Sequence, residues 1–198
     1  MSELLVSLLA FALVATISPG GATTLATASG AQFGFKHSMP LMAGISVGLA
    51  SLVSAAALGL GSVTRAAPQL ELWLRIVASA YLLWLAWTIG RQGAPGSGSN
   101  GPTTPIGFVA GLLLLWANPK GWTMAIATAG TYARLADNPL TLAAILGAVF
   151  GLSASLSLSI WCSGGVWLAR VIRSVRGWRV LNVTLALLLA ASIVLMWR

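Results

Sequence analysis

Charged residues, cysteine and histidine are scarce in this sequence, and each scarcity excludes a class of protein. Only 7% of the 198 residues are charged, whereas about a quarter are charged in a soluble domain. A single cysteine, Cys162, excludes an internal disulfide and a Cys-x-x-Cys redox pair. One histidine and three acidic residues form neither a metal-binding cluster nor a nucleophile paired with a base. We therefore expect no enzyme, no metal site and no cofactor.

Apolar residues make up 58% of the chain, and the mean hydropathy is +0.90. They are arranged in six runs, each close to the length of about 20 residues that a membrane-spanning helix needs. The runs cover residues 4–28, 39–63, 70–90, 105–130, 139–168 and 179–197. No lysine or arginine precedes the first run, so we interpret that run as a retained helix and not as a signal peptide. The sequence predicts an all-α integral membrane protein with a single transmembrane domain, residues 1–198.

The six runs fall into two similar halves. A stretch rich in Gly, Ser and Pro at residues 91–105 predicts a linker between a first repeat, about 1–90, and a second repeat, about 106–198. A shift of 100 residues aligns "SPGG" at Ser18–Gly21 with "NPKG" at Asn118–Gly121. Each half holds three helices, an odd number, so the two repeats must be inverted relative to each other in the membrane. Inverted repeats with broken first helices are typical of secondary transporters.

The two Pro-Gly motifs predict breaks within the first and fourth membrane helices. A proline has no N–H and leaves the carbonyl one turn before it without a donor. In a bilayer such groups are tolerated only against protein or a water-filled cavity, and a new helix start suits an anion such as a carboxylate. The pattern predicts a substrate site at the paired breaks, and an ordinary proline kink is the alternative. The candidate residues are Ser18, Pro19, Gly20, Gly21, Asn118, Pro119, Lys120 and Gly121. Tyr81 and Trp116 are further candidates, as aromatic lining of the pathway, and plain packing is the equal alternative for both.

Lys120 is the charge that is expected deepest in the membrane. Its ammonium would pair with an anionic substrate group or with a freed carbonyl; the alternative is that it extends to the interface. The acidic residues are predicted near helix ends or in loops, and His37 is predicted in a loop beside Lys36, so the sequence offers no proton carrier at mid-membrane. Transport would then be driven through the charge of the substrate or would be uncoupled.

The basic residues predict the orientation of the chain. If the N-terminus is outside, six of them follow the first, third and fifth helices and four lie on the opposite side. The six are Lys36, Arg91, Arg170, Arg173, Arg176 and Arg179, and the four are Arg65, Arg75, Arg134 and Arg198. We expect a multi-pass protein of the cytoplasmic (inner) membrane with both termini extracytoplasmic. This rule explains the net charge of +8 better than nucleic acid does, so no nucleic-acid partner is expected. Membrane lipid is a candidate partner of the arginine cluster, and an ordinary solvated cytoplasmic loop is the favoured alternative to a specific lipid site.

Two spacings of glycine predict close helix contacts. Gly30-x-x-x-Gly34 and Gly44-x-x-x-Gly48 suit packing within one chain, and they also allow a homodimer. Serines alternate along the fifth run, at Ser153, Ser155, Ser157 and Ser159. Because this spacing is not helical, the serines spread around a helix and do not form the polar stripe of a channel.

The sequence resembles the LysE/RhtB family of amino-acid exporters over almost its whole length. The resemblance rests on "SPGG" with the glycines that follow it, on "AYLL" at Ala80–Leu83, on "NPK" at Asn118–Lys120, and on "LN" at Leu181–Asn182 after the basic loop. Gly21 replaces the second proline of the family motif. The resemblance implies a small six-helix exporter of amino acids or related metabolites. An uncoupled small-solute channel and a non-transporting membrane scaffold are the alternatives.

Overall fold

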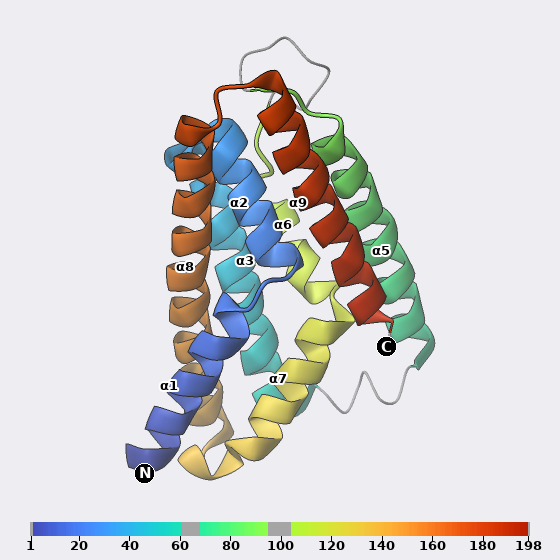
Figure 1. Ribbon diagram of the computed structural model, residues 1–198. Coiled ribbons are helices and arrows are strands. Elements are labelled where there is room, and N and C mark those ends of the chain that lie inside the picture. Colours follow the sequence, from blue (N-terminus) through green and yellow to red (C-terminus); the bar gives the residue numbers. More distant parts are fainter. Residues whose placement is uncertain (1, 61–67, 95–103, 198) are drawn as a thin grey trace.

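The chain folds into a bundle of helices in the computed structural model, which describes residues 2–60, 68–94 and 104–197 (Figure 1). No strand occurs within these ranges, so the predicted all-α class is confirmed. The elements are α1 (Ser2–Ile17), α2 (Gly21–Phe33), α3 (Phe35–Ala55), the π-helical turn η1 (Ala56–Leu60), α5 (Pro68–Gly90), α6 (Phe108–Trp116), α7 (Pro119–Thr131), the 3-10 turn η2 (Ala133–Leu135), α8 (Pro139–Val171) and α9 (Val175–Met196).

The first and fourth apolar runs each form two helices, as the Pro-Gly motifs predict. α1 ends at Ile17 and α2 begins at Gly21, with a bend of 58° between them. α6 ends at Trp116 and α7 begins at Pro119. In Figure 1 the α1–α2 pair ascends and the α6–α7 pair descends, and the two breaks lie at mid-height of the bundle. The other four predicted runs correspond to α3 with η1, to α5, to α8 and to α9.

Several helices are long and apolar enough to cross a membrane. Among the described residues they are Phe35–Gly59, Pro139–Val171 and Val175–Val194, and the bent α1–α2 pair is a fourth if it is counted as one broken span. Within α5 only Ile76–Gly90 is recognised, as a shorter apolar helix. Large apolar side chains such as Val6, Leu152 and Leu187 are at least 65% exposed, as expected of a surface that faces lipid. The structure therefore supports a multi-pass membrane protein, with up to four of the six predicted spans recognised by length and composition.

Glycines hold the central helices close together. A Cβ added at Gly48 of α3 would lie 3.0 Å from the carbonyl oxygen of Leu112, and one at Gly111 of α6 would lie 2.7 Å from that of Leu41. A Cβ at Gly30 of α2 would similarly meet Cys162 of α8. These helices can approach only because glycine has no side chain. These contacts pack α2 against α8 and α6 against α3, so one helix of each broken pair is fixed to the central helices.

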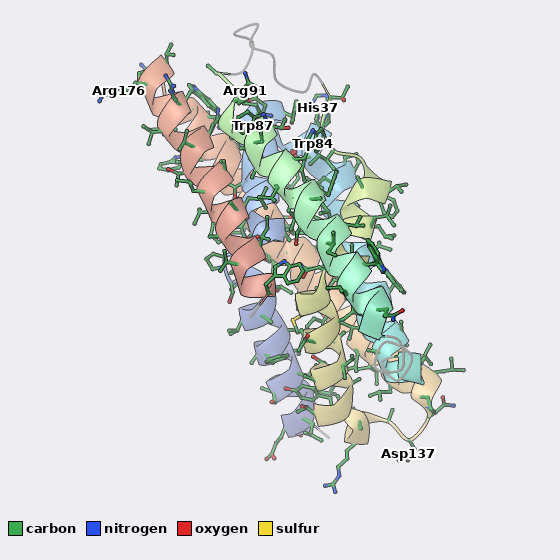
Figure 2. All side chains as sticks on the ribbon, turned by 90° about the vertical axis from the view of Figure 1, so that its right-hand side faces the viewer. His37, Trp84, Trp87, Arg91, Asp137 and Arg176 are labelled. Carbon is green, nitrogen blue, oxygen red and sulfur yellow. The ribbon has the colours of Figure 1, made fainter. Side chains whose placement is uncertain are left out.

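The labelled charged side chains and His37 lie at the two ends of the bundle (Figure 2). His37, Arg91 and Arg176 lie at one end, which we call the basic end, and Asp137 lies at the other. Lys36 and His37 were expected in a loop, and this expectation is wrong. They lie in the first turn of α3, because Gly34 has a φ of 80° and turns the chain directly from α2 into α3. Of the other basic positions, Arg65 and Arg198 lie outside the described residues, as do residues 95–103 of the predicted linker.

Candidate functional site

The two helix breaks meet around one cavity near the middle of the bundle. The larger part of the cavity, about 130 Å³, is lined by Ser18, Pro19, Gly20 and Gly21 from the first break and by Asn118 and Gly121 from the second. An adjoining part of about 50 Å³ shares Gly20, Gly21 and Asn118 and extends to Leu82 of α5 and Ser192 of α9. We call the two parts together the central cavity. None of its described lining side chains carries a formal charge.

Six of the ten predicted site residues line this cavity. Pro119 and Lys120 form the first turn of α7, but their side chains lie outside the described part of the chain. Tyr81 and Trp116 do not line the central cavity. Trp116 lies at the second break and Tyr81 lines a separate pocket.

The end of α1 has most of its last carbonyl groups paired. Ser18 donates from Oγ to the carbonyl oxygen of Val14 at 2.6 Å. From α8, Ser157 donates from Oγ to that of Thr16 at 2.7 Å, and the indole N–H of Trp161 donates to that of Ile17 at 3.1 Å. The bonds to Thr16 and Ile17 satisfy groups that an α-helix leaves open at its C-terminus, and the carbonyl of Val14 also accepts the backbone N–H of Ser18 at 3.2 Å. α8 therefore fixes the first break from outside the broken pair.

Of the last four carbonyl groups in α1, only that of Ala15 is not covered by these bonds. In a continuous helix its donor would be the N–H of residue 19, but Pro19 has none. The structure records no other donor to it within the described residues. Ala15 lines the central cavity. The carbonyl without a recorded donor is therefore part of a residue that borders this space.

The start of α2 is built from glycine and a threonine. Gly20 is extended, with a φ of −172°, and its N–H donates to Thr23 Oγ1 at 2.8 Å. Thr23 Oγ1 also lies 3.0 Å from the carbonyl oxygen of Gly20. The first N–H groups of a helix have no acceptor within the helix, and here they belong to Gly21 and Ala22, both of which line the central cavity. The positive end of the α2 dipole therefore faces the same space as the end of α1.

Trp116 stabilises the second break. Its indole N–H donates to Ser51 Oγ at 3.0 Å, and its own carbonyl oxygen accepts the indole N–H of Trp122 at 2.8 Å. The two rings meet edge to face, with centroids 5.4 Å apart. Trp116 is thus the last residue of α6 and the acceptor that joins α6 to α7 across the break.

Tyr81 lies in a different pocket, closer to the basic end. Its ring stacks on Trp84 with centroids 5.7 Å apart, and both residues line a space of about 250 Å³ with Ser29, Thr88 and Gln92. This pocket shares one lining residue, Leu25, with the central cavity.

Four residues of the site were not among the predicted site residues: Ala15, Thr23, Ser157 and Trp161. The 100-residue alignment does pair Thr23 with Thr123, and a threonine three residues after a helix-starting glycine is a capping signal. Nothing local marks Ser157 and Trp161, since their acceptors lie 141 and 144 residues earlier in the chain.

Comparison with known proteins agrees with this architecture. The family model described as LysE type translocator matches residues 13–195. A cysteine/O-acetylserine efflux protein of Salmonella typhimurium is 28% identical over 90% of both chains, and one from Escherichia coli O1:K1 is 27% identical over the same share. A Klebsiella pneumoniae protein of the same name is 33% identical over 59% of each chain. No solved structure matches significantly.

The match covers both breaks, every residue that lines the central cavity, and the arginine-rich connection between α8 and α9. A translocator moves a solute without transforming it, in agreement with the lack of a catalytic constellation in the sequence. The chain therefore belongs to the LysE type translocator family and is a membrane transporter, not an enzyme.

Proposed function

We propose that this protein exports a small amino acid or a related metabolite across the cytoplasmic membrane and binds it in the central cavity. The observation that carries the proposal is the meeting of the two helix breaks: Gly20 and Gly21 line the same space as Asn118 and Gly121. The relatives named as cysteine/O-acetylserine efflux proteins support a substrate of this chemistry.

The groups around the first break match the two ends of a zwitterion. The first-turn N–H groups of α2, at Gly21 and Ala22, would bind a carboxylate, because the helix N-terminus combines free donors with a positive dipole end. The carbonyl oxygen of Ala15 would accept an N–H of the substrate ammonium. Both groups belong to residues of the same cavity, so one molecule can bind both at once.

The size of the cavity favours a small substrate. A dry cavity of about 150 Å³ accommodates benzene, a molecule with six non-hydrogen atoms, and the larger part of the central cavity has a volume of about 130 Å³. An amino acid with a short uncharged side chain is of this size. A long cationic side chain would need more room and a partner for its charge.

We extend the proposal to the architecture in the membrane. α1–α2, α3 and α5 would form one repeat, and α6–α7, α8 and α9 would form a second, inverted repeat. The opposite directions of the two broken pairs in Figure 1 support this arrangement. The basic end would face the cytoplasm, since it carries Arg91 and Arg176 (Figure 2). Both chain termini would then lie outside.

The test is a measurement of efflux from cells loaded with single amino acids, with serine, alanine, cysteine, O-acetylserine, lysine and glutamate compared. We expect export of at least one of the small uncharged solutes. Ala22→Leu would add three carbons inside the cavity and should lower that export about tenfold or more, since the larger side chain would occupy space that the substrate needs. Ala10→Leu, at an exposed position of α1, is the matched control and should leave export unchanged. If Ala22→Leu exports as the unmodified chain does, the substrate does not bind in this cavity.

A further inference from the structure

The pocket that contains Tyr81 lies between the central cavity and the basic end, and we call it the vestibule. It has a volume of about 250 Å³ and is lined by α2, by α5 and by the segment that leads into α6. Its lining includes Phe33 and Gln92, which lie at or just beyond the ends of α2 and α5. His37, Trp84 and Arg91 mark the same end of the bundle in Figure 2.

Two helices pass from the central cavity to the vestibule within one or two turns. On α2, Ala22 lines the central cavity, Leu25 lines both spaces, and Ser29 lines the vestibule. On α5, Leu82 lines the central cavity, whereas its neighbour Tyr81 and also Leu85 line the vestibule, so here the two spaces lie on different sides of the helix at similar heights. The boundary between the two spaces is therefore made by leucines on both helices.

α6 makes the same change at the same boundary. Ala110 lines the vestibule and Leu114, about one turn later, lines the central cavity. Leu25, Leu82, Leu85 and Leu114 together form what we call the leucine collar, and they are only 2%, 6%, 3% and 8% exposed. On α2 and α6 the change takes about one helical turn, which rises about 5.4 Å, whereas on α5 two consecutive residues, Tyr81 and Leu82, line the two spaces.

We propose that the vestibule is a second binding site for the transported solute and that the leucine collar is the gate between this site and the central cavity. The inference rests on the proposed function. A constriction lined only by apolar side chains excludes water and solutes until its walls move apart. The collar has this composition, and its residues belong to three different helices, so movement of any one of α2, α5 and α6 can open it.

The lining of the vestibule defines the class of solute. Its polar groups are the hydroxyls of Ser29, Tyr81, Thr88 and Thr104, the amide of Gln92 and the indole N–H of Trp84, and the stacked rings of Tyr81 and Trp84 supply apolar surface. None of the described lining residues is charged, so a solute with a net charge would lose water there without gaining an ion partner. The vestibule therefore suits a small solute with no net charge, such as an amino acid with an uncharged side chain.

A lipid chain is the competing occupant, because Trp84 is 57% exposed on the outer surface of α5. Labelling of single cysteines in membrane vesicles separates the two. Cys162 is fully buried, so the unmodified chain supplies the background rate. Arg176→Cys and Asp137→Cys report the two ends of the bundle, and Leu187→Cys reports a position that faces lipid.

With a membrane-impermeant cationic thiol reagent, Thr88→Cys should react from the same side as Arg176→Cys and about tenfold or more faster than Leu187→Cys, because a thiol reacts where water reaches it. A rate equal to that of Leu187→Cys would identify the vestibule as a lipid groove, and reaction only from the Asp137→Cys side would place its opening at the wrong end. Either result overturns the proposal.

The gate is tested on the other side of the collar. Ser192→Cys, in the central cavity, should react slowly from the basic end, and the addition of Leu25→Ala should accelerate it about tenfold, since the truncation opens an apolar constriction. Leu114→Ala replaces Leu25→Ala if the latter fails to insert. An unchanged rate at Ser192→Cys in a correctly inserted variant would show that the collar is not the barrier.

The solute class is tested with three reagents of similar size at Thr88→Cys. The rate of each reagent at Thr88→Cys is divided by its rate with free cysteine. By this relative rate, the neutral reagent should react about tenfold faster than the cationic and the anionic one, because a charged reagent loses hydration in the uncharged lining without gaining an ion partner. A charged reagent that equals the neutral one would refute the assignment. Labelling requires no transport, so these results and the efflux results can fail independently of each other.

Discussion

The indole nitrogen of Trp161 lies 3.1 Å from the carbonyl oxygen of Ile17, the last residue of α1, and donates a hydrogen bond to it. The second break contains a similar bond, from the indole of Trp122 to the carbonyl of Trp116, the last residue of α6. In both places a tryptophan N–H satisfies a carbonyl that the broken helix leaves open. The two donors come from different elements, since Trp122 belongs to α7 and Trp161 to α8. The breaks are thus supported as permanent parts of the fold.

Trp161→Phe should destabilise the protein through this bond. The substitution keeps an aromatic ring and removes the N–H, so the Ile17 carbonyl loses its donor at a cost of about 1–3 kcal/mol. We expect the Tm in detergent to fall by about 2–4 °C for each kcal/mol. Trp167→Phe is the control, because Trp167 is on the same helix and is 61% exposed. Equal Tm values for the two variants would argue against a stabilising role of the bond.

Pro19→Ala should impair export while the protein still inserts. Alanine supplies the N–H that Pro19 lacks, so the Ala15 carbonyl can gain a helical bond and α1 can continue toward α2. We expect efflux to fall about tenfold or more, because the cavity depends on the break. Pro139→Ala is the matched control, since Pro139 occupies the start of α8, where a helix needs no such N–H. Full efflux at matched expression would reduce Pro19 to an ordinary kink.

Lys120→Met should weaken substrate binding if its ammonium contacts the substrate carboxylate. The residue lies in the first turn of α7, and methionine keeps much of its length without the charge. A charge-assisted contact contributes about 1.5–3 kcal/mol, so the apparent KM for efflux should rise about tenfold or more. Lys120→Arg should recover only part of the loss, because the guanidinium places its donors differently. An unchanged KM in Lys120→Met would assign the carboxylate to the N–H groups of α2 alone.

The orientation of the chain gives a further prediction. Arg170, Arg173, Arg176 and Arg179 lie between or near the ends of α8 and α9, and such clusters mark cytoplasmic connections. A reporter enzyme that is active only in the cytoplasm should therefore be inactive when it is fused after residue 198. A reporter inserted after Arg173 should be active. The reverse pattern would invert the topology and with it the direction assigned to the vestibule.

The positions of the breaks were predictable because proline and glycine act locally on the helix that contains them. Each motif removes donors or rigidity within a single turn, so "SPGG" and "NPKG" mark α1–α2 and α6–α7 without any tertiary information. The support of the breaks was not predictable. Ser157 and Trp161 reach α1 because α8 crosses it, and that crossing depends on packing between segments far apart in the sequence.

The place of Tyr81 was not predictable for a related reason. α5 is apolar around most of its circumference, so its sequence does not indicate which side faces a cavity. Tyr81 and Leu82 are neighbours in the chain, yet they line different spaces. The sequence could place an aromatic residue near a solute path, and only the arrangement of α2, α5 and α6 decides on which side of the collar it lies.

The 58° joint between α1 and α2 has a mechanical consequence. α2 is held against α8 by the glycine contacts of Gly30 and Gly165, whereas α1 is connected to α2 only through the short segment at residues 18–20. A continuous helix would behave as one rigid lever, and tilting its lower part would tilt its upper part as well. A jointed one would let α1 tilt while α2 stays in place, but only after the bonds from Ser157 and Trp161 of α8 to the end of α1 break. In a carrier, these two bonds would then control the end of the path nearest α1 separately from the other end.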